Sequence, residues 1–184
     1  LIKSEGMNAI RHLRKVFPGL TLLADMKTMD AGRAEMEMAA KAGANIAVVM
    51  GDAPDSTIKE CIQAGKNYVI KVCVDFINSS KVEERVADIE KWGADYIAVH
   101  TAIDDQMHGK TPFSTLQRIC SKVKIPVAVA GGINSENVID AVNAGASIVI
   151  VGGYISKSKD AKIAAESIKT AIKENKRVGT TLFK

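Results

Sequence analysis

The sequence predicts an α/β fold of the TIM (β/α)8-barrel type, in which this chain lacks the first strand–helix–strand. Short apolar runs alternate with amphipathic stretches, and charged residues or glycine pairs follow the runs. Strict alternation of strands and helices implies parallel strands with right-handed crossovers, in either a doubly wound sheet or a barrel. Six predicted strands leave a barrel two strands short, with a helix at about residues 8–16 before the first of them.

Four glycines mark the ends of helices that lead into strands. Gly43, Gly65, Gly93 and Gly145 each follow a helix-like stretch and precede an apolar run. Glycine suits the left-handed residue that closes a helix, where a side chain is penalised. The runs are short, rich in Val and Ile and not alternating, as expected for strands buried on both faces. The predicted strands are residues 20–24, 46–50, 68–72, 96–99, 127–130 and 148–151.

Amphipathic helices are predicted between these strands. Residues 31–42, 80–92 and 160–174 carry apolar side chains at three- and four-residue spacing. Residues 55–56 and 135–137 resemble helix starts, with capping side chains and acids in the first turn. No linker-like segment interrupts the chain, so we expect a catalytic barrel domain at residues 1–175. The basic tail at residues 176–184 is expected to cover a barrel end or to lead into another segment.

Composition indicates a soluble globular protein of the cytoplasm with a bias toward small anionic ligands. The chain is 47 % hydrophobic and 25 % charged, and its formal net charge of +4 comes from interspersed residues. Only 4 % of residues are aromatic, which argues against nucleic-acid binding. No apolar run is long enough to span a membrane, and none resembles a signal peptide. The isolated cysteines, Cys61, Cys73 and Cys120, suit a reducing compartment.

The densest charge cluster follows the first predicted strand, as Asp25-x-Lys27-x-x-Asp30. Strand alternation places Asp25 and Lys27 on one side of the chain, facing the barrel mouth where ligands bind. A lysine between two carboxylates stays protonated and can stabilise an oxyanion, while a carboxylate can hold a divalent metal. The alternative interpretation is a surface ion-pair cluster in which Asp30 caps the next helix.

His100 directly follows the fourth predicted strand, at residues 96–99. A lone histidine is more often structural, but this position at the barrel mouth favours a general acid or base near neutral pH. The carboxylates of Asp52, Asp75 and Asp105 are expected to be solvated or to cap helices.

Glycine pairs follow the last two predicted strands, as Gly131-Gly132 and Gly152-Gly153. Backbone N–H groups approach an anion closely where no side chain intervenes, and phosphate sites recur after the seventh and eighth strands of these barrels. The alternative is that the pairs only permit tight turns. Their equivalent positions favour phosphate binding.

Four segments make the sequence resemble the orotidine 5'-monophosphate decarboxylase suprafamily and, within it, the 3-hexulose-6-phosphate synthase family. They are LADMKTMDAG (23–32), HTAIDDQ (100–106), VAGGI (129–133) and VGGYI (151–155). The Asp-x-Lys-x-x-Asp motif is specific to the suprafamily, and the His-Thr-x-x-Asp-x-Gln segment points to the synthases. The resemblance covers residues 1–173.

The resemblance implies a Mg²⁺-dependent aldolase that joins formaldehyde to D-ribulose 5-phosphate, giving D-arabino-hex-3-ulose 6-phosphate, or runs in reverse. By this resemblance Asp25 is a metal ligand, and Lys27 stabilises the cis-enediolate. Asp30 would complete the site of the neighbouring subunit in a homodimer, and His100 would transfer protons. The two glycine pairs would hold the substrate phosphate: Gly131, Gly132, Gly152 and Gly153.

The sequence departs from its relatives in three ways. The relatives begin with a strand ending in Asp and a second ending in a metal-binding Glu, and this chain starts after that segment, so we expect the fragment alone to lack part of the site. Gly152-Gly153 stands where relatives often carry Gly-Arg, so one phosphate cation is missing or is supplied elsewhere. Ile103 stands where the sister 3-keto-L-gulonate 6-phosphate decarboxylases have Arg, which argues against that alternative. The remaining alternative is a non-catalytic phosphate-binding barrel.

Overall fold

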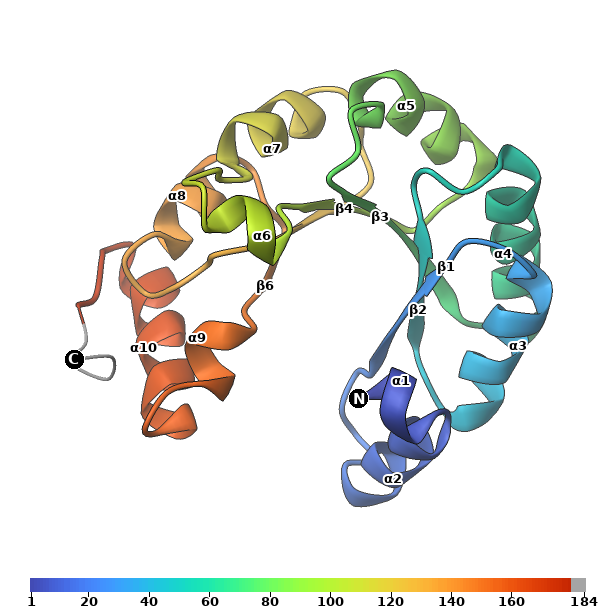
Figure 1. The fold of residues 1–184 in the computed structure, drawn as a ribbon, viewed down its shortest axis with the longest axis horizontal. Helices are drawn as coiled ribbons and strands as arrows, with labels where there is room; N and C mark the ends of the chain where they lie inside the picture. Colours follow the sequence, from blue (N-terminus) through green and yellow to red (C-terminus); the bar gives the residue numbers. More distant parts are fainter. Residues whose placement is uncertain (180–184) are drawn as a thin grey trace. The chain divides into compact units, whose positions relative to one another are not determined.

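The computed structural model describes residues 1–179, in two compact units of alternating strands and helices (Figure 1). The first unit comprises Leu1–Ile97, and the second begins at Ala98. Strand β4 (Tyr96–His100) contributes its first two residues to the first unit and its last three to the second.

The first unit contains three parallel strands in chain order. β1 pairs with β2, and β2 pairs with β3, both in parallel register. The other elements of this unit are helices, which precede, separate and follow these strands along the chain. The elements are α1 (Ile2–Glu5), α2 (Asn8–Val16), β1 (Leu23–Thr28), α3 (Gly32–Ala42), β2 (Ile46–Met50), α4 (Asp55–Tyr68), β3 (Lys71–Ile77) and α5 (Val82–Trp92).

The second unit continues the same alternation. Its strands β5 and β6 pair in parallel, with Val129 opposite Val149. The elements that follow β4 are α6 (Ile103–Gln106), α7 (Phe113–Cys120), β5 (Val127–Ala130), α8 (Val138–Asn143), β6 (Ile148–Ile150), α9 (Gly153–Ser156) and α10 (Ala161–Glu174). The predicted parallel strand–helix alternation is therefore present in both units.

The core of the first unit forms where helices α3 and α4 pack on the strands. Val49 and Val74, on the neighbouring strands β2 and β3, are fully buried. Met36 of α3 and Ile58 of α4 are also fully buried. Each such side chain contributes about 1.5–3 kcal/mol by leaving water. Because β2 is buried along most of its length, its sequence is a continuous apolar run, as predicted for a strand covered on both faces.

Glycines close three of the four helices for which they were predicted to do so. Gly43 and Gly93 are the C-caps of α3 and α5, each with φ +100°, and Gly145, with φ +102°, follows α8. The prediction for Gly65 is wrong, because this residue lies inside α4. A Cβ there would lie 2.8 Å from the Ile70 carbonyl oxygen, so this glycine permits a close approach of backbone instead.

Two predicted strands are displaced. The first was expected at residues 20–24 and is found at Leu23–Thr28, so the Asp-x-Lys motif lies within the strand. The third was expected at residues 68–72, but α4 extends to Tyr68 and the strand runs over Lys71–Ile77. In both cases the pairing with β2 decides the position of the strand, and local hydrophobicity does not.

The start of the predicted basic tail lies against the second unit. Arg177 forms an ion pair with Asp140 of α8 at 3.0 Å, and the Val178 amide donates to the Ser135 carbonyl at 3.0 Å. The Ser135 hydroxyl in turn donates to the Val178 carbonyl. Residues 180–184 of the predicted tail lie outside the described residues.

No helix in the described part of the chain is long and apolar enough to cross a membrane. The three cysteines are free thiols, as expected. Burial raises the pKa of Cys61 and of Cys73 to about 12. The cytoplasmic location remains a prediction.

Val69 closes helix α4 in a conformation that suits glycine. It has φ +55°, and the residue is 92 % exposed, so it gains almost nothing from packing. A left-handed conformation costs a residue with a Cβ about 1–2 kcal/mol. We expect Val69→Gly to raise the free energy of unfolding by about 0.5–1 kcal/mol, because relief of this strain exceeds the entropy that glycine adds to the unfolded chain. Urea unfolding measures this, and Val69→Ala, which keeps a Cβ, should gain less.

Candidate active site

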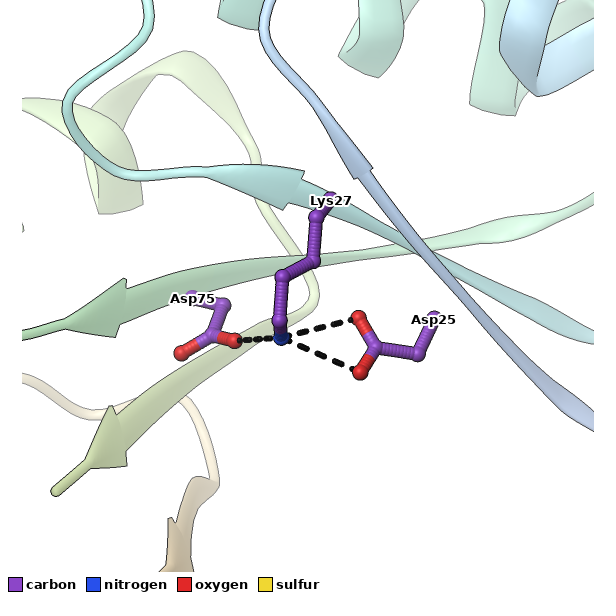
Figure 2. A network of polar contacts seen from close by, with 3 residues as sticks. All are labelled: Asp25, Lys27 and Asp75. Atoms are coloured by element: carbon purple, nitrogen blue, oxygen red, sulfur yellow. Dashed lines mark hydrogen bonds and ion pairs between the residues drawn. The ribbon is translucent and has the colours of Figure 1, made fainter. Parts of the chain in front are cut away.

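Lys27 lies between two carboxylates that come from different strands (Figure 2). Its Nζ donates to Asp25 Oδ1 and Oδ2 at 3.1 and 3.0 Å, and to Asp75 Oδ2 at 2.7 Å. Asp25 and Lys27 belong to β1, whereas Asp75 belongs to β3, which is separated from β1 by β2. The lysine therefore reaches across one strand to join residues that are 48 positions apart in the sequence.

An irregularity in β1 positions the lysine. The register with β2 shifts between Ala24 and Thr28, and Lys27 within this bulge has φ +48°. A bulge re-aims a side chain, and a non-glycine residue in this region carries backbone strain of about 1–3 kcal/mol. Thr28, which ends the strand, is buried and its hydroxyl donates to the Glu35 carboxylate of α3. The end of the bulge is thus anchored to the following helix.

The charges around Lys27 keep it an ammonium. Partial burial is the largest single influence and lowers the pKa, but the hydrogen bonds and charges of Asp75 and Asp25 together outweigh it. The pKa therefore lies above its ordinary value of 10.5. At neutral pH Lys27 is a fixed positive charge that can stabilise negative oxygen, and not a base.

Asp75 is part of this network, and the expectation that it is solvated or caps a helix is wrong. Its side chain is only 5 % exposed, compared with 50 % for Asp25. The expectation failed because the strand sequence does not show which partner lies across the sheet. One signal was available: Asp75 is a charged residue within the run Val72–Phe76, which otherwise has the composition of a buried strand. By contrast, Asp52 is exposed and accepts from Ser79 at 2.8 Å.

We expect Asp75→Asn to lower kcat by about 10- to 100-fold, because Lys27 would then be held by the half-exposed Asp25 alone, and misplacement by about 1 Å costs this much. Asp52→Asn, which also changes a carboxylate near the end of a strand, is the matched control and should retain activity. Steady-state kinetics on both variants test this. Equal kcat for Asp75→Asn and wild type would mean that Asp75 does not position the lysine.

Asp30 does not join the Lys27 network. Its Oδ1 accepts from the Ala31 amide at 2.7 Å, next to the start of α3. It borders a separate hollow of ≈ 550 Å³ between the first turns of α3 and α4. The interpretation in which Asp30 caps α3 is wrong, because the N-cap of α3 is Ala31 and no side chain caps this helix. The role of Asp30 toward a second subunit stays a prediction.

Of the two carboxylates that hold Lys27, Asp25 is the one with substantial access to solvent. Asp25 and Lys27 border a hollow of ≈ 410 Å³ whose other walls include Ile10 and Leu13 of α2. No group of three or more His, Cys, Asp or Glu in residues 1–179 has the arrangement of a metal site. Mg²⁺ keeps several waters and is often held by one or two carboxylates together with substrate oxygens. Asp25 fits such a limited role.

His100 and the first glycine pair lie at adjacent strand ends in the second unit. His100 ends β4, and the next residue, Thr101, donates its amide to the Ala130 carbonyl at the end of β5 at 3.1 Å. Gly131 and Gly132 follow with φ +107° and +70°. These angles require glycine at both positions, so the pair forms a turn that side-chain-bearing residues disfavour.

Gln106 packs on this glycine turn, a contact that sequence reasoning did not identify. Its Nε2 donates to the Thr101 carbonyl at 2.7 Å, and its side chain lies 3.1 Å from a Cβ built on Gly131 and 3.3 Å from one built on Gly132. The HTAIDDQ segment carried Gln106 as part of the resemblance, but spacing alone did not indicate this contact. Asp105 pairs with Lys110 at 2.6 Å, consistent with a structural role.

The second glycine pair follows β6. Gly152 and Gly153 are both exposed, and nothing lies within 4 Å of a Cβ built on Gly152. Tyr154, the next residue, shares a hydrogen bond of 2.8 Å with the hydroxyl of Ser135, which lies shortly after the first glycine pair. The segments after β5 and β6 are thus joined, so the structure brings the two predicted phosphate loops together.

These features define a class of protein. Parallel strands and helices alternate, a lysine–carboxylate network lies on the early strands, and glycine turns follow the late strands. This is the organisation of a β/α-barrel enzyme with its chemistry at the carboxyl ends of the strands.

The chain belongs to the orotidine 5'-phosphate decarboxylase / HUMPS family, whose model matches residues 1–168. It is 38 % identical over 173 residues to 3-hexulose-6-phosphate synthase of Bacillus subtilis, covering 94 % of this chain and 82 % of that protein. The crystal structure of 3-hexulose-6-phosphate synthase from Salmonella typhimurium superposes with a TM-score of 0.90 at 36 % identity, over 94 % of this chain and 82 % of that one. A 3-keto-L-gulonate-6-phosphate decarboxylase from Vibrio cholerae shares the fold, with a TM-score of 0.79 at 21 % identity over 95 % of this chain and 82 % of that one.

The comparisons confirm the predicted family and fold class. The fold is of the TIM-barrel type, with the six strands described above, and the chain is an enzyme of the lyase type found among its curated relatives.

Proposed function

We propose that this protein is a 3-hexulose-6-phosphate synthase, which adds formaldehyde to D-ribulose 5-phosphate to give D-arabino-hex-3-ulose 6-phosphate, or catalyses the reverse reaction. The observation that carries this proposal is the Lys27 ammonium held between Asp25 and Asp75 at the strand ends, in a chain 38 % identical to synthases of that name. A fixed cation at this place suits a reaction in which negative charge develops on adjacent oxygens.

In the proposed reaction, removal of a proton from C1 of the sugar gives a cis-enediolate, whose C1 then bonds to the carbon of formaldehyde. Lys27 holds the negative charge of the enediolate, and Asp25 and Asp75 hold Lys27. His100 transfers the proton at the reacting carbon or at the aldehyde oxygen. The glycine turns at Gly131-Gly132 and Gly152-Gly153 bind the phosphate.

Mg²⁺ is the proposed cofactor, and Asp25 is the residue that would hold it. When bound, Mg²⁺ supplies Lewis-acid stabilisation of the two sugar oxygens that become negatively charged. Asp25 suits this because half of its side chain is exposed, whereas Asp75 is almost fully buried.

A direct assay tests the proposal. The natural protein, with Mg²⁺, should consume formaldehyde only when D-ribulose 5-phosphate is present, and should release no CO₂ from 3-keto-L-gulonate 6-phosphate. CO₂ release without formaldehyde consumption would assign the sister decarboxylase activity instead. Binding of ribulose 5-phosphate with neither reaction would support a non-catalytic phosphate-binding protein.

A homodimer with shared active sites is also proposed, because Asp30 is exposed and lies away from the Lys27 network. We expect Asp30→Ala and Lys27→Met each to be inactive alone. When the two variants are mixed and exchange subunits, the mixture should regain up to about a quarter of wild-type activity per site, because one of the two sites in each hybrid dimer has both residues intact. Formaldehyde consumption by the mixture measures this. Activity equal to the sum of the separate variants would show that Asp30 acts within its own subunit or not at all.

A further inference from the structure

Lys157 lies against Gly153, at the turn that follows β6. The Cδ and Cε atoms of Lys157 are 3.8 and 3.9 Å from a Cβ built on Gly153. The space beside this glycine is therefore lined by the aliphatic stem of a lysine four residues later. Lys157 is exposed, so its ammonium is available to a ligand in solution.

The backbone of α9 places the lysine there. The Lys157 amide donates to the Gly153 carbonyl at 3.0 Å, and the Ser156 amide donates to the Gly152 carbonyl at 3.1 Å. In such a turn residues i and i+4 lie one above the other, and side chains lean toward the N-terminal end. The Lys157 side chain consequently runs back toward the Gly152-Gly153 turn.

Within residues 1–179, no carboxylate forms an ion pair with Lys157. This distinguishes it from Lys27, which is held by Asp25 and Asp75, and from Lys110, which pairs with Asp105. An ammonium without a carboxylate partner beside a glycine turn keeps its charge for an incoming anion.

Tyr154 fixes the turn from which the lysine projects. Its hydroxyl lies 2.8 Å from Ser135 Oγ and 3.2 Å from Ser167 Oγ, and both serines are buried. These bonds tie α9 to α10 and to the segment after the first glycine pair. Lys157 is thus attached to an anchored part of the second unit, which limits where its ammonium can move.

We propose that Lys157 is the cation that contacts the phosphate of the sugar ester at the Gly152-Gly153 turn. Backbone N–H groups contribute partial charge only, whereas a phosphate monoester is close to a dianion at neutral pH and binds most strongly to charged donors. Lysine meets phosphate as a point charge that needs no fixed geometry. The inference rests on the proposed function. Lys157 provides the positively charged phosphate ligand that Gly153, which has no side chain, does not.

Calorimetric titration of the full chain with D-ribulose 5-phosphate, and separately with unphosphorylated D-ribulose, tests this. Lys157→Met should weaken binding of the phosphate ester by about 10- to 50-fold, as expected for a lost charged contact, and leave D-ribulose binding unchanged. Lys157→Arg should stay within about threefold of wild type, because it retains the charge. In turnover, KM should rise and kcat should change little. Lys162→Met, an exposed lysine in the first turn of α10, is the matched control and should bind as wild type.

The outcomes separate this inference from the function on which it rests. If wild type binds ribulose 5-phosphate and Lys157→Met binds it equally well, Lys157 is not a phosphate ligand, and the proposed function stands. An equal loss in Lys162→Met would also overturn the inference, because general surface charge would then explain the effect. If wild type binds ribulose 5-phosphate no better than ribulose, the proposed function and the inference fail together. The melting temperature of a second variant, Lys157→Gln, is compared with that of wild type. An unchanged melting temperature shows that a loss of ribulose 5-phosphate binding is not caused by unfolding.

Discussion

Lys27→Met is expected to lower kcat by about 10³-fold, the largest effect of any single substitution in the site. The variant keeps the length of the side chain but removes the charge that would stabilise the enediolate, and loss of one such donor costs about 10²- to 10³-fold or more. Exchange of solvent deuterium into ribulose 5-phosphate should fall in parallel, since it reports formation of the enediolate without formaldehyde. Lys71→Met is the matched control, because Lys71 also lies on a strand and pairs with an aspartate, Asp95, at 2.7 Å. Undiminished exchange in Lys27→Met would rule out the enediolate role.

The same substitution removes the ammonium that pairs with the buried Asp75 carboxylate, so we also expect a loss of about 3 kcal/mol in the free energy of unfolding. The double variant Lys27→Met/Asp75→Asn should recover much of this stability but none of the activity, which separates folding from catalysis. Because the pKa of Lys27 in the folded protein is raised above 10.5, the stabilisation is complete below that pH and is lost as the pH rises through the folded-state pKa. The stability advantage of wild type over the double variant should therefore be constant from pH 6 to 9 and shrink only in more alkaline solution.

Gly131→Ala is expected to destabilise the protein by about 3–4 kcal/mol. Gly131 has φ +107°, and a Cβ at this position would overlap the Thr101 carbonyl oxygen and lie 3.0 Å from the Thr101 amide nitrogen. Both contacts are with backbone, which cannot move aside as the end of a flexible side chain can. Thermal and urea unfolding measure the loss.

Two other glycines serve as comparisons for Gly131. Gly19→Ala should be close to neutral, since nothing lies within 4 Å of a Cβ there. Gly152→Ala meets equally open space, so it should fold normally but bind ribulose 5-phosphate more weakly if its turn contacts the phosphate. A Gly131→Ala protein as stable as Gly19→Ala would contradict the geometry of the turn.

Local features of the fold could be predicted from the sequence, and features set by pairing could not. Gly43 and Gly93 were recognisable because a helix closes within a few residues of its own chain. Gly65 has the same local sequence pattern, yet its lack of a side chain accommodates the Ile70 carbonyl and the Val72 side chain, which only the folded chain brings close. The bulge at Lys27 likewise depends on the register with β2.

The candidate site shows the same division. The two-residue spacing of Asp25 and Lys27 predicted that they lie on one side of the chain, and the structure pairs them at 3.0 Å. Asp75 was expected to be solvated or to cap a helix, because its partner lies two strands away and no local spacing encodes that distance. Lys157 was not singled out, since an exposed lysine in a polar stretch has no distinguishing sequence context.

The environment of Lys27 has a further consequence for an enzyme that is proposed to use formaldehyde. Free amines and thiolates attack the carbon of formaldehyde with their lone pairs and form hydroxymethyl adducts. An ammonium held by two carboxylates offers no lone pair, because its pKa lies above 10.5. Cys73, two residues before Asp75 on β3, is likewise kept as a neutral thiol by burial, with a pKa of about 12. Charge pairing at Lys27 and burial at Cys73 therefore leave neither group with a reactive lone pair for the aldehyde that the enzyme is proposed to use.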